Sequence, residues 1–240
     1  MIRSFKILMS YFFKQYLRSN KYVAPFVVYA ICLVAAYGQR PVYVMSSYLF
    51  TSIFIYFFAA WLTFNFNGSE EPVQQQLNIL HIKKENYYYI CKVLFILMII
   101  IVVSIVTVFF PIVGRFFIRR VYALEVVAAI LSHVVIGLLG ISTAVLFDER
   151  LIKSGRSRFL YLASILIVSI IVIPISVHYS FIKWIMIVFP PSYLIINRLG
   201  SIDVMGFSSF YKLIVDLAIV IVYSTALIFI YLKLMKRKRF

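Results

Sequence analysis

Residues 93–113 read VLFILMIIIVVSIVTVFFPIV and contain no charged side chain. A membrane hydrocarbon layer is about 30 Å thick and an α-helix advances about 1.5 Å per residue, so roughly 20 apolar residues cross the layer as a helix. The stretch has that length and that composition. It predicts a membrane-spanning helix, and this prediction decides the class of fold for the whole chain.

The rest of the chain has the same apolar character. Of its 240 residues, 64% are hydrophobic and 18% are aromatic, which is more than a soluble domain of this size is able to bury. The sequence predicts an all-α, polytopic membrane protein made of a single transmembrane domain over residues 1–240. Six apolar segments predict six spanning helices, at residues 22–37, 42–64, 93–113, 121–147, 159–178 and 213–232.

The basic residues are distributed unevenly between the two sides of this arrangement. Of the 24 Lys and Arg, all but seven fall in the termini and loops that share one side of the membrane. The seven on the other side are Arg40, Arg115, Arg119, Arg120, Lys183, Arg198 and Lys212. The positive-inside rule therefore predicts that both termini are cytoplasmic. This topology, with attraction to anionic lipid, accounts for the net charge of +16, and no nucleic-acid partner is predicted.

The N-terminal segment, residues 1–21, has two chemically different faces. Placed on a helix, Phe5, Phe12 and other apolar side chains occupy one sector and the basic side chains, such as Lys14, occupy the opposite one. This pattern predicts an amphipathic helix that lies in the inner membrane interface. Two roles remain open for it: a simple anchor beside the first span, and a connecting helix that touches a cytoplasmic partner.

The longest polar stretch is the predicted cytoplasmic loop at residues 65–92. Gly68 interrupts the second span, Pro72 suits a first helical turn, and apolar residues then recur at helical spacing, which predicts a short amphipathic helix over residues 71–80. Residues 87–89 are three tyrosines, interpreted as an aromatic band at the membrane interface. The helix is interpreted either as a docking element for a partner or as an ordinary cytoplasmic turn. Its candidate contact residues are Glu70, Glu71, Gln74, Gln75, Gln76, Leu77 and Leu80.

Two further apolar features carry structural predictions. Residues 181–191 are too short to cross the membrane and end in Pro190 and Pro191, which favours an outer re-entrant or interfacial segment. In the fourth span, small residues lie near one face and permit close approach of another helix. These residues, which predict a seam either within the chain or between two copies, are Gly137, Gly140 and Ala144.

Ionisable residues within or near the predicted spans are few. Glu125 and a Lys212 to Asp216 pair are expected near the outer interface, where pairing or snorkelling suffices. His133 is expected to lie deep in the fourth span. It is the membrane-buried polar candidate of the chain, and a neutral, hydrogen-bonded structural role is favoured over a functional one.

Motifs that would indicate an enzyme are missing from the sequence. There is no GxxxxGK[ST] phosphate loop, and Gln75 stands where an EExxxR protease motif beginning at Glu70 requires arginine. The three histidines belong to different segments, without the spacing of a zinc site. Cys32 and Cys91 are expected at different depths and are not predicted to form a disulfide. The sequence thus predicts a non-catalytic protein that binds no metal and no cofactor.

The overall layout resembles that of the type-two (ABC-2-like) permeases of ATP-binding-cassette exporters. The matching parts are an amphipathic helix at residues 2–16, six spans, a cytoplasmic helix at residues 71–80 between spans two and three, and the apolar piece that ends at Pro191. The resemblance covers nearly the whole chain and rests on architecture. In that family the amphipathic helix corresponds to a connecting helix, and the cytoplasmic helix corresponds to a coupling helix received by the nucleotide-binding subunit. The apolar piece corresponds to outer re-entrant helices.

The resemblance implies a permease subunit of a bacterial exporter in the cell membrane. Its cargo would be a peptide, an antimicrobial compound or another amphipathic molecule, and ATP would be hydrolysed by a separate cytoplasmic ABC ATPase subunit. The permease would act as a homodimer or paired with a sister permease. Two alternatives remain open: a membrane immunity or sensor protein for an antimicrobial peptide, and a stand-alone secondary transporter.

Overall fold

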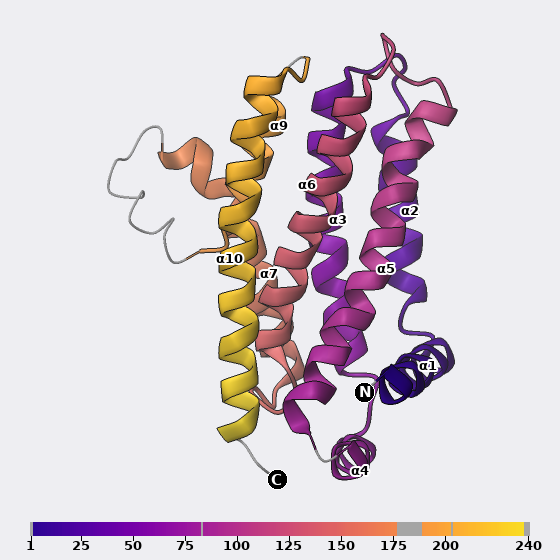
Figure 1. Ribbon diagram of the computed structural model, residues 1–240, viewed down its shortest axis with the longest axis vertical. Helices are drawn as coiled ribbons and strands as arrows, with labels where there is room; N and C mark the ends of the chain where they lie inside the picture. Colours follow the sequence, from indigo (N-terminus) through magenta and orange to yellow (C-terminus); the bar gives the residue numbers. More distant parts are fainter. Residues whose placement is uncertain (1, 83, 177–188, 203, 238–240) are drawn as a thin grey trace.

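The computed structural model describes residues 2–82, 84–176, 189–202 and 204–237 (Figure 1). Within these ranges every regular element is a helix, and the only β-type contact is an isolated bridge between Val42 and Phe117. The predicted all-α class is confirmed. The elements are α1 (Ile2–Ser19), α2 (Val23–Ala36), α3 (Val44–Asn67), α4 (Pro72–Ile82), α5 (Glu85–Val113), α6 (Ala123–Ala144), the 3₁₀ turn η1 (Val145–Phe147), α7 (Gly155–Ser176), α9 (Ser192–Gly200) and α10 (Phe207–Arg237).

Four of these helices are long and apolar enough to cross a membrane: α3, α5, α6 continued through η1, and α10. The pair formed by α1 and α2 is bent by 82° and adds a fifth span if the two are taken together. Such helices fit a multi-pass membrane protein. The prediction of six spans is not confirmed, because α2 has only 14 residues and the predicted span at residues 159–178 runs past Ser176, where the described part of α7 ends.

The long helices stand side by side, and two shorter ones lie across one end of them (Figure 1). In that view α2, α3, α5, α6 and α10 follow the long axis, whereas α1 and α4 are seen nearly end-on at the bottom. The C-terminal end of α10 lies at this same end. The connections from α2 to α3 and from α5 to α6 lie at the opposite end.

The contact between α3 and α6 forms the centre of the molecule. Gly140 of α6 lies so close to α3 that a Cβ atom there would be 2.6 Å from the carbonyl oxygen of Tyr56, and Gly137 is closely packed against Ile100 of α5. Ala144 is also fully buried. The small residues of the predicted seam thus pack against helices of the same chain. Helices in a membrane gain little from the hydrophobic effect when they associate, so close van der Waals packing at small residues stabilises their contact.

The segment predicted as a cytoplasmic loop is mostly helical. α3 ends at Gly68, Pro72 occupies the first position of α4, and α5 begins at Glu85. Tyr88 and Tyr89 therefore belong to α5, and both are fully buried. Their interpretation as an interfacial aromatic band is wrong, because they face buried polar groups of the protein rather than lipid headgroups.

The predicted re-entrant segment at residues 181–191 falls mainly on residues 181–188, which lie outside the described ranges. Its last two residues, Pro190 and Pro191, precede α9. This short helix packs against α3, α7 and α10 near the end opposite to α4.

Candidate functional site

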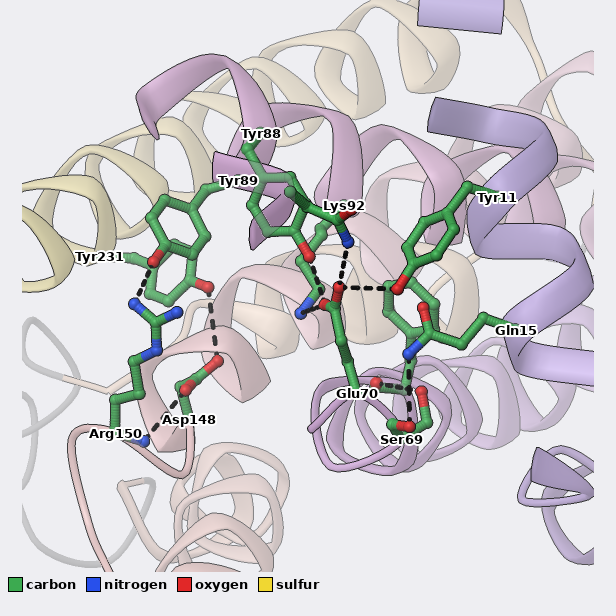
Figure 2. Close-up of polar contacts among 12 residues, drawn as sticks. Tyr11, Gln15, Ser69, Glu70, Tyr88, Tyr89, Lys92, Asp148, Arg150 and Tyr231 are labelled. Carbon is green, nitrogen blue, oxygen red and sulfur yellow. Dashed lines mark hydrogen bonds and ion pairs between the residues drawn. The ribbon is translucent and has the colours of Figure 1, made fainter. Parts of the chain in front are cut away.

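A buried carboxylate, that of Glu70, lies between the short helix α4 and the bundle (Figure 2). Its Oε1 accepts hydrogen bonds from the Tyr11 hydroxyl at 3.1 Å and from Nδ2 of Asn78 at 3.0 Å. Its Oε2 accepts a hydrogen bond from the Tyr88 hydroxyl and pairs with Nζ of Lys92 at 3.1 Å. The four donors come from α1, α4 and α5, so one side chain holds three helices together.

The chemistry of these groups fits an ionised carboxylate. A carboxylate offers about four acceptor positions, and four donors surround this one. Both side chains of the Glu70–Lys92 pair are almost entirely buried, and a buried ion pair holds only if its remaining hydrogen-bonding positions are satisfied. Tyr11 belongs to α1, outside the four spanning helices, where burial and then the charge of Glu70 raise its pKa to about 12. Its hydroxyl therefore stays protonated and donates at neutral pH.

The chain just before Glu70 is also attached to α1 and its C-terminal extension. Nε2 of Gln15 donates to the carbonyl of Ser69 at 3.3 Å, and Nζ of Lys21 donates to the carbonyl of Gly68 at 2.5 Å. These bonds satisfy carbonyl groups left open where α3 ends. The turn that leads into α4 is thus attached to α1 through both its backbone and its buried carboxylate.

A second polar cluster lies at the same end of the bundle (Figure 2). The buried Asp148, in the turn between η1 and α7, accepts the backbone N–H of Arg150 at 3.1 Å and the hydroxyl of Tyr231 in α10 at 3.5 Å. Nη1 of Arg150 donates to the hydroxyl of Tyr89 at 2.5 Å. This cluster connects the turn before α7 with α5 and α10.

The two clusters touch through consecutive tyrosines of α5. The rings of Tyr88, in the Glu70 cluster, and Tyr89, in the Asp148 cluster, are 5.6 Å apart and nearly perpendicular. Tyr89 also stacks edge-on with Tyr231 at 5.6 Å. A continuous set of buried contacts therefore runs from α1 and α4 through α5 to α10.

The outward side of α4 is apolar. The exposed fractions of Val73, Leu77 and Leu80, at helical spacing, are 64%, 57% and 71%. The opposite side of the helix carries Asn78, which donates to Glu70, and the buried Gln75.

The predicted contact residues of this helix therefore separate into two groups. Glu71 and Gln74 are exposed and Gln76 is half-buried, beside the exposed Leu77 and Leu80. The other two, Glu70 and Gln75, are buried. Their prediction as contact residues for a partner is wrong, because both side chains are buried and Glu70 is surrounded by four hydrogen-bond donors of the same chain.

His133 lies in the centre of the bundle and is completely buried. Its Nδ1 is 2.6 Å from the carbonyl oxygen of Ala129, one helical turn earlier, and its Nε2 is 2.9 Å from Oγ1 of Thr51 on α3. A neutral imidazole with its hydrogen on Nδ1 satisfies both contacts. The geometry is that of a structural histidine joining α6 to α3.

Two ion pairs lie toward the opposite end. Glu125 is buried and accepts two hydrogen bonds from Arg119, at 2.5 and 2.9 Å, together with backbone N–H groups of Tyr122 and Met205. The expected pairing of Asp216 with Lys212 is wrong: Asp216 instead pairs with Nε of Arg198 in α9 at 2.6 Å. The sequence separation of 18 residues explains why local spacing did not indicate it.

The described residues contain no group of three or more His, Cys, Asp or Glu arranged to hold a metal ion. What the site offers chemically is a rigid set of hydrogen bonds and charges at the base of an exposed apolar helix. Comparisons with protein-family models, with curated proteins and with solved structures found no match for this chain.

Proposed function

We propose that this chain is the membrane-spanning permease subunit of an ATP-binding-cassette exporter, and that α4 is the element that docks the cytoplasmic ATPase. One observation carries the proposal. α4 lies across the end of the bundle with Val73, Leu77 and Leu80 turned outward, while Glu70 and Asn78 attach its other side to α1 and α5. An exposed apolar row ringed by polar residues, here Gln74 and Glu71, is the usual composition of a protein interface.

The attachment of α4 supports a mechanical role. A helix that merely covered the end of the bundle would not need a buried ion pair beneath it. Because Glu70 contacts Tyr11, Tyr88 and Lys92, displacement of α4 by a partner is transmitted directly to α1 and α5. Through Tyr89 the same movement reaches α10. Closure of two ATPase subunits on ATP binding would in this way repack the spanning helices.

The charge distribution supports the orientation that this proposal needs. Basic side chains are concentrated at the end formed by α1, α4 and the C-terminal end of α10, which the positive-inside rule assigns to the cytoplasm. The ATPase, which supplies the energy, is then on the same side as α4. The cargo we propose is a peptide or another amphipathic compound, and the permease pairs with a second copy or with a sister permease.

The proposal is tested by affinity purification of the tagged full chain from its native membrane in mild detergent, followed by mass spectrometry and an ATPase assay. We expect a cassette ATPase to be recovered in stoichiometric amount. The variant Leu77→Ser with Leu80→Ser should lower that recovery about tenfold or more, because buried anchor residues dominate interface free energies. The matched control is Val204→Ser with Phe207→Ser, which changes two exposed apolar residues at the opposite end.

Unchanged recovery in the α4 variant, or an equal loss in the control, contradicts docking through α4. Repeated recovery of the intact chain without an ATPase contradicts the exporter proposal as a whole.

A further inference from the structure

A groove of 640 Å³ opens in the elbow between α1 and α2, along the flank of α5. Its walls include Phe13 and Leu17 of α1, Phe26 of α2, and Met98 and Val102 of α5, and every lining side chain is apolar or aromatic. Figure 1 shows how the elbow arises: α1 turns across the lower end of α2 beside α5. The groove is thus bounded by a helix that lies across the bundle and by two that run along it.

The shape of the groove is fixed by packed rings. Tyr16, which lines it, is 4% exposed and its hydroxyl reaches the carbonyl of Leu62. Its ring contacts those of Tyr22 and Phe95, at centroid distances of 5.9 and 6.5 Å, and Tyr22 contacts Phe26 at 6.3 Å. The first contact is tilted and the other two are edge-on, and together they fix the floor of the groove, which is therefore preformed.

The lining determines what is able to fill the groove. Water needs two to four polar partners, and the walls supply apolar surface instead. The open side is apolar as well, with Phe13 56% and Val102 61% exposed. Since α5 is a membrane-spanning candidate, the apolar material next to this groove is the hydrocarbon of the bilayer. Burial of an acyl chain against these walls is favourable by the same hydrophobic term that drives folding.

The charges of α1 indicate which kind of lipid is selected. Lys14 and Arg18 each follow a groove residue, Phe13 and Leu17, and both are exposed. Both cations also line a second depression next to the groove residues of α1, together with Tyr11, Gln15 and Ser69. The sequence of α1 contains no acidic residue, so nothing on the helix neutralises these cations. Helices with this division of faces lie at the depth of the lipid phosphates.

We propose that the elbow groove binds one acyl chain of an anionic phospholipid, whose phosphate lies against Lys14 and Arg18. The bound lipid stabilises α1 in the plane of the inner membrane interface. It thereby also stabilises the position of Tyr11, which donates from α1 to Glu70. This inference depends on the geometry of α1, α2 and α5 and does not require that α4 docks an ATPase.

The test measures lipid retained by the purified full chain in mild detergent, by native mass spectrometry after addition of phosphatidylglycerol or phosphatidylcholine. Val102→Trp fills the groove from α5 and should lower retained phosphatidylglycerol about tenfold, equivalent to roughly 1.4 kcal/mol. The matched control is Val106→Trp, one turn further along α5, which is similarly exposed but does not line the groove. We expect this control to retain lipid like the unmodified chain.

A second pair of variants acts from α1, in case a tryptophan on α5 interferes with folding. Phe13→Ser removes a wall of the groove and should also lower retention, whereas Ile7→Ser, similarly exposed on α1 but outside the groove, should not. Lys14→Gln with Arg18→Gln should remove the preference for phosphatidylglycerol over phosphatidylcholine, a change of roughly thirtyfold at about 1 kcal/mol for each cation.

Several outcomes overturn the proposal. One is equal lipid retention by the groove variants and their controls. Another is equal retention of the two lipids by the unmodified chain. A third is a dimer that buries Val102 against a second copy, detected by cross-linking through a cysteine at that position.

Discussion

Glu70 and Glu71 are neighbours in the sequence but lie in opposite environments. Glu70 is buried with four donors, and Glu71 is exposed. Replacing Glu70 by Gln keeps the shape of the side chain but leaves the Lys92 ammonium buried without a counter-charge. We expect this variant to lose about 3 kcal/mol of stability. Thermal unfolding in detergent, followed by size-exclusion chromatography, should show a melting temperature lower by roughly 6 °C or more.

Two further variants define what this result means. Glu71→Gln changes an exposed carboxylate one residue away and should shift stability by less than about 0.5 kcal/mol. Adding Lys92→Met to Glu70→Gln removes the uncompensated charge and should restore part of the loss. Equal melting temperatures for the Glu70 and Glu71 variants would show that the ion pair does not stabilise the attachment of α4.

His133 gives a second prediction at the scale of a residue. Thr51→Val keeps the volume of the side chain but removes the hydroxyl that faces Nε2 of the buried imidazole. Leaving this nitrogen without a partner should cost about 1–3 kcal/mol. Thr225→Val is the matched control, because Thr225 is exposed on α10 and its hydroxyl donates only to its own helix. A destabilisation of the same size in both variants, measured by thermal unfolding, would contradict the role assigned to the His133 contact.

Among the helices, α6 has the tightest contact with its neighbours. A Cβ atom at Gly140 would lie 2.6 Å from the backbone carbonyl of Tyr56, and a backbone atom moves only together with its helix. Gly140→Ala should therefore destabilise the fold by about 1–3 kcal/mol. At Gly206, by contrast, no heavy atom lies within 4 Å of such a Cβ, and Gly206→Ala should be tolerated. Folded yield and melting temperature of the two variants would compare these costs directly, and a tolerated Gly140→Ala would contradict the close approach of α3 and α6.

The sequence allowed α3, α5, α6 and α10 to be predicted because each contains one apolar run long enough to cross a membrane. It also predicted α4, since a Gly68 break, Pro72 and a recurring apolar spacing act locally. It did not predict that Tyr88 and Tyr89 are buried. Near a membrane the lipid-facing and protein-facing sides of a helix are both apolar, so hydropathy alone does not separate them.

The candidate site was predicted in position but not in the roles of its residues. Adjacent Glu70 and Glu71 look alike to any local pattern, and the donors that distinguish them come from three helices. One signal was present in the sequence: Tyr88 and Lys92 are four residues apart, on one face of an otherwise apolar helix. Polar groups in such a place require a partner. The identity of that partner depended on how α1 and α4 fold back onto α5.

For the molecule as a whole, one end carries both buried polar clusters and also the exposed apolar row of α4. The Glu70 cluster joins α1, α4 and α5, and the Asp148 cluster joins α5, α10 and the turn before α7. Elements far apart in the sequence are therefore connected to one another at this end. The opposite end is held separately, by the Arg119–Glu125 and Arg198–Asp216 pairs. This division agrees with the mechanical role that we propose for α4.

Single cysteines are able to test which of the two ends faces the cytoplasm. In a background with Cys32→Ala and Cys91→Ala, we expect Arg120→Cys and Ser201→Cys to react with a membrane-impermeant maleimide added to intact cells. Arg120 belongs to the connection between α5 and α6, and Ser201 follows α9 directly. Figure 1 shows this connection and α9 toward the end opposite to α4. Glu71→Cys, next to α4, and Lys236→Cys, at the end of α10, should react only after permeabilisation.

The physical reason is the excess of Lys and Arg around α1, α4 and the end of α10, which hinders transfer of that end across the membrane. Labelling of Ser201→Cys on the same side as Lys236→Cys would contradict a single crossing by α10. Labelling of Glu71→Cys from outside would place α4 away from any cytoplasmic ATPase and remove the basis for docking there, whereas the lipid groove in the elbow of α1 and α2 would keep its geometry in either orientation.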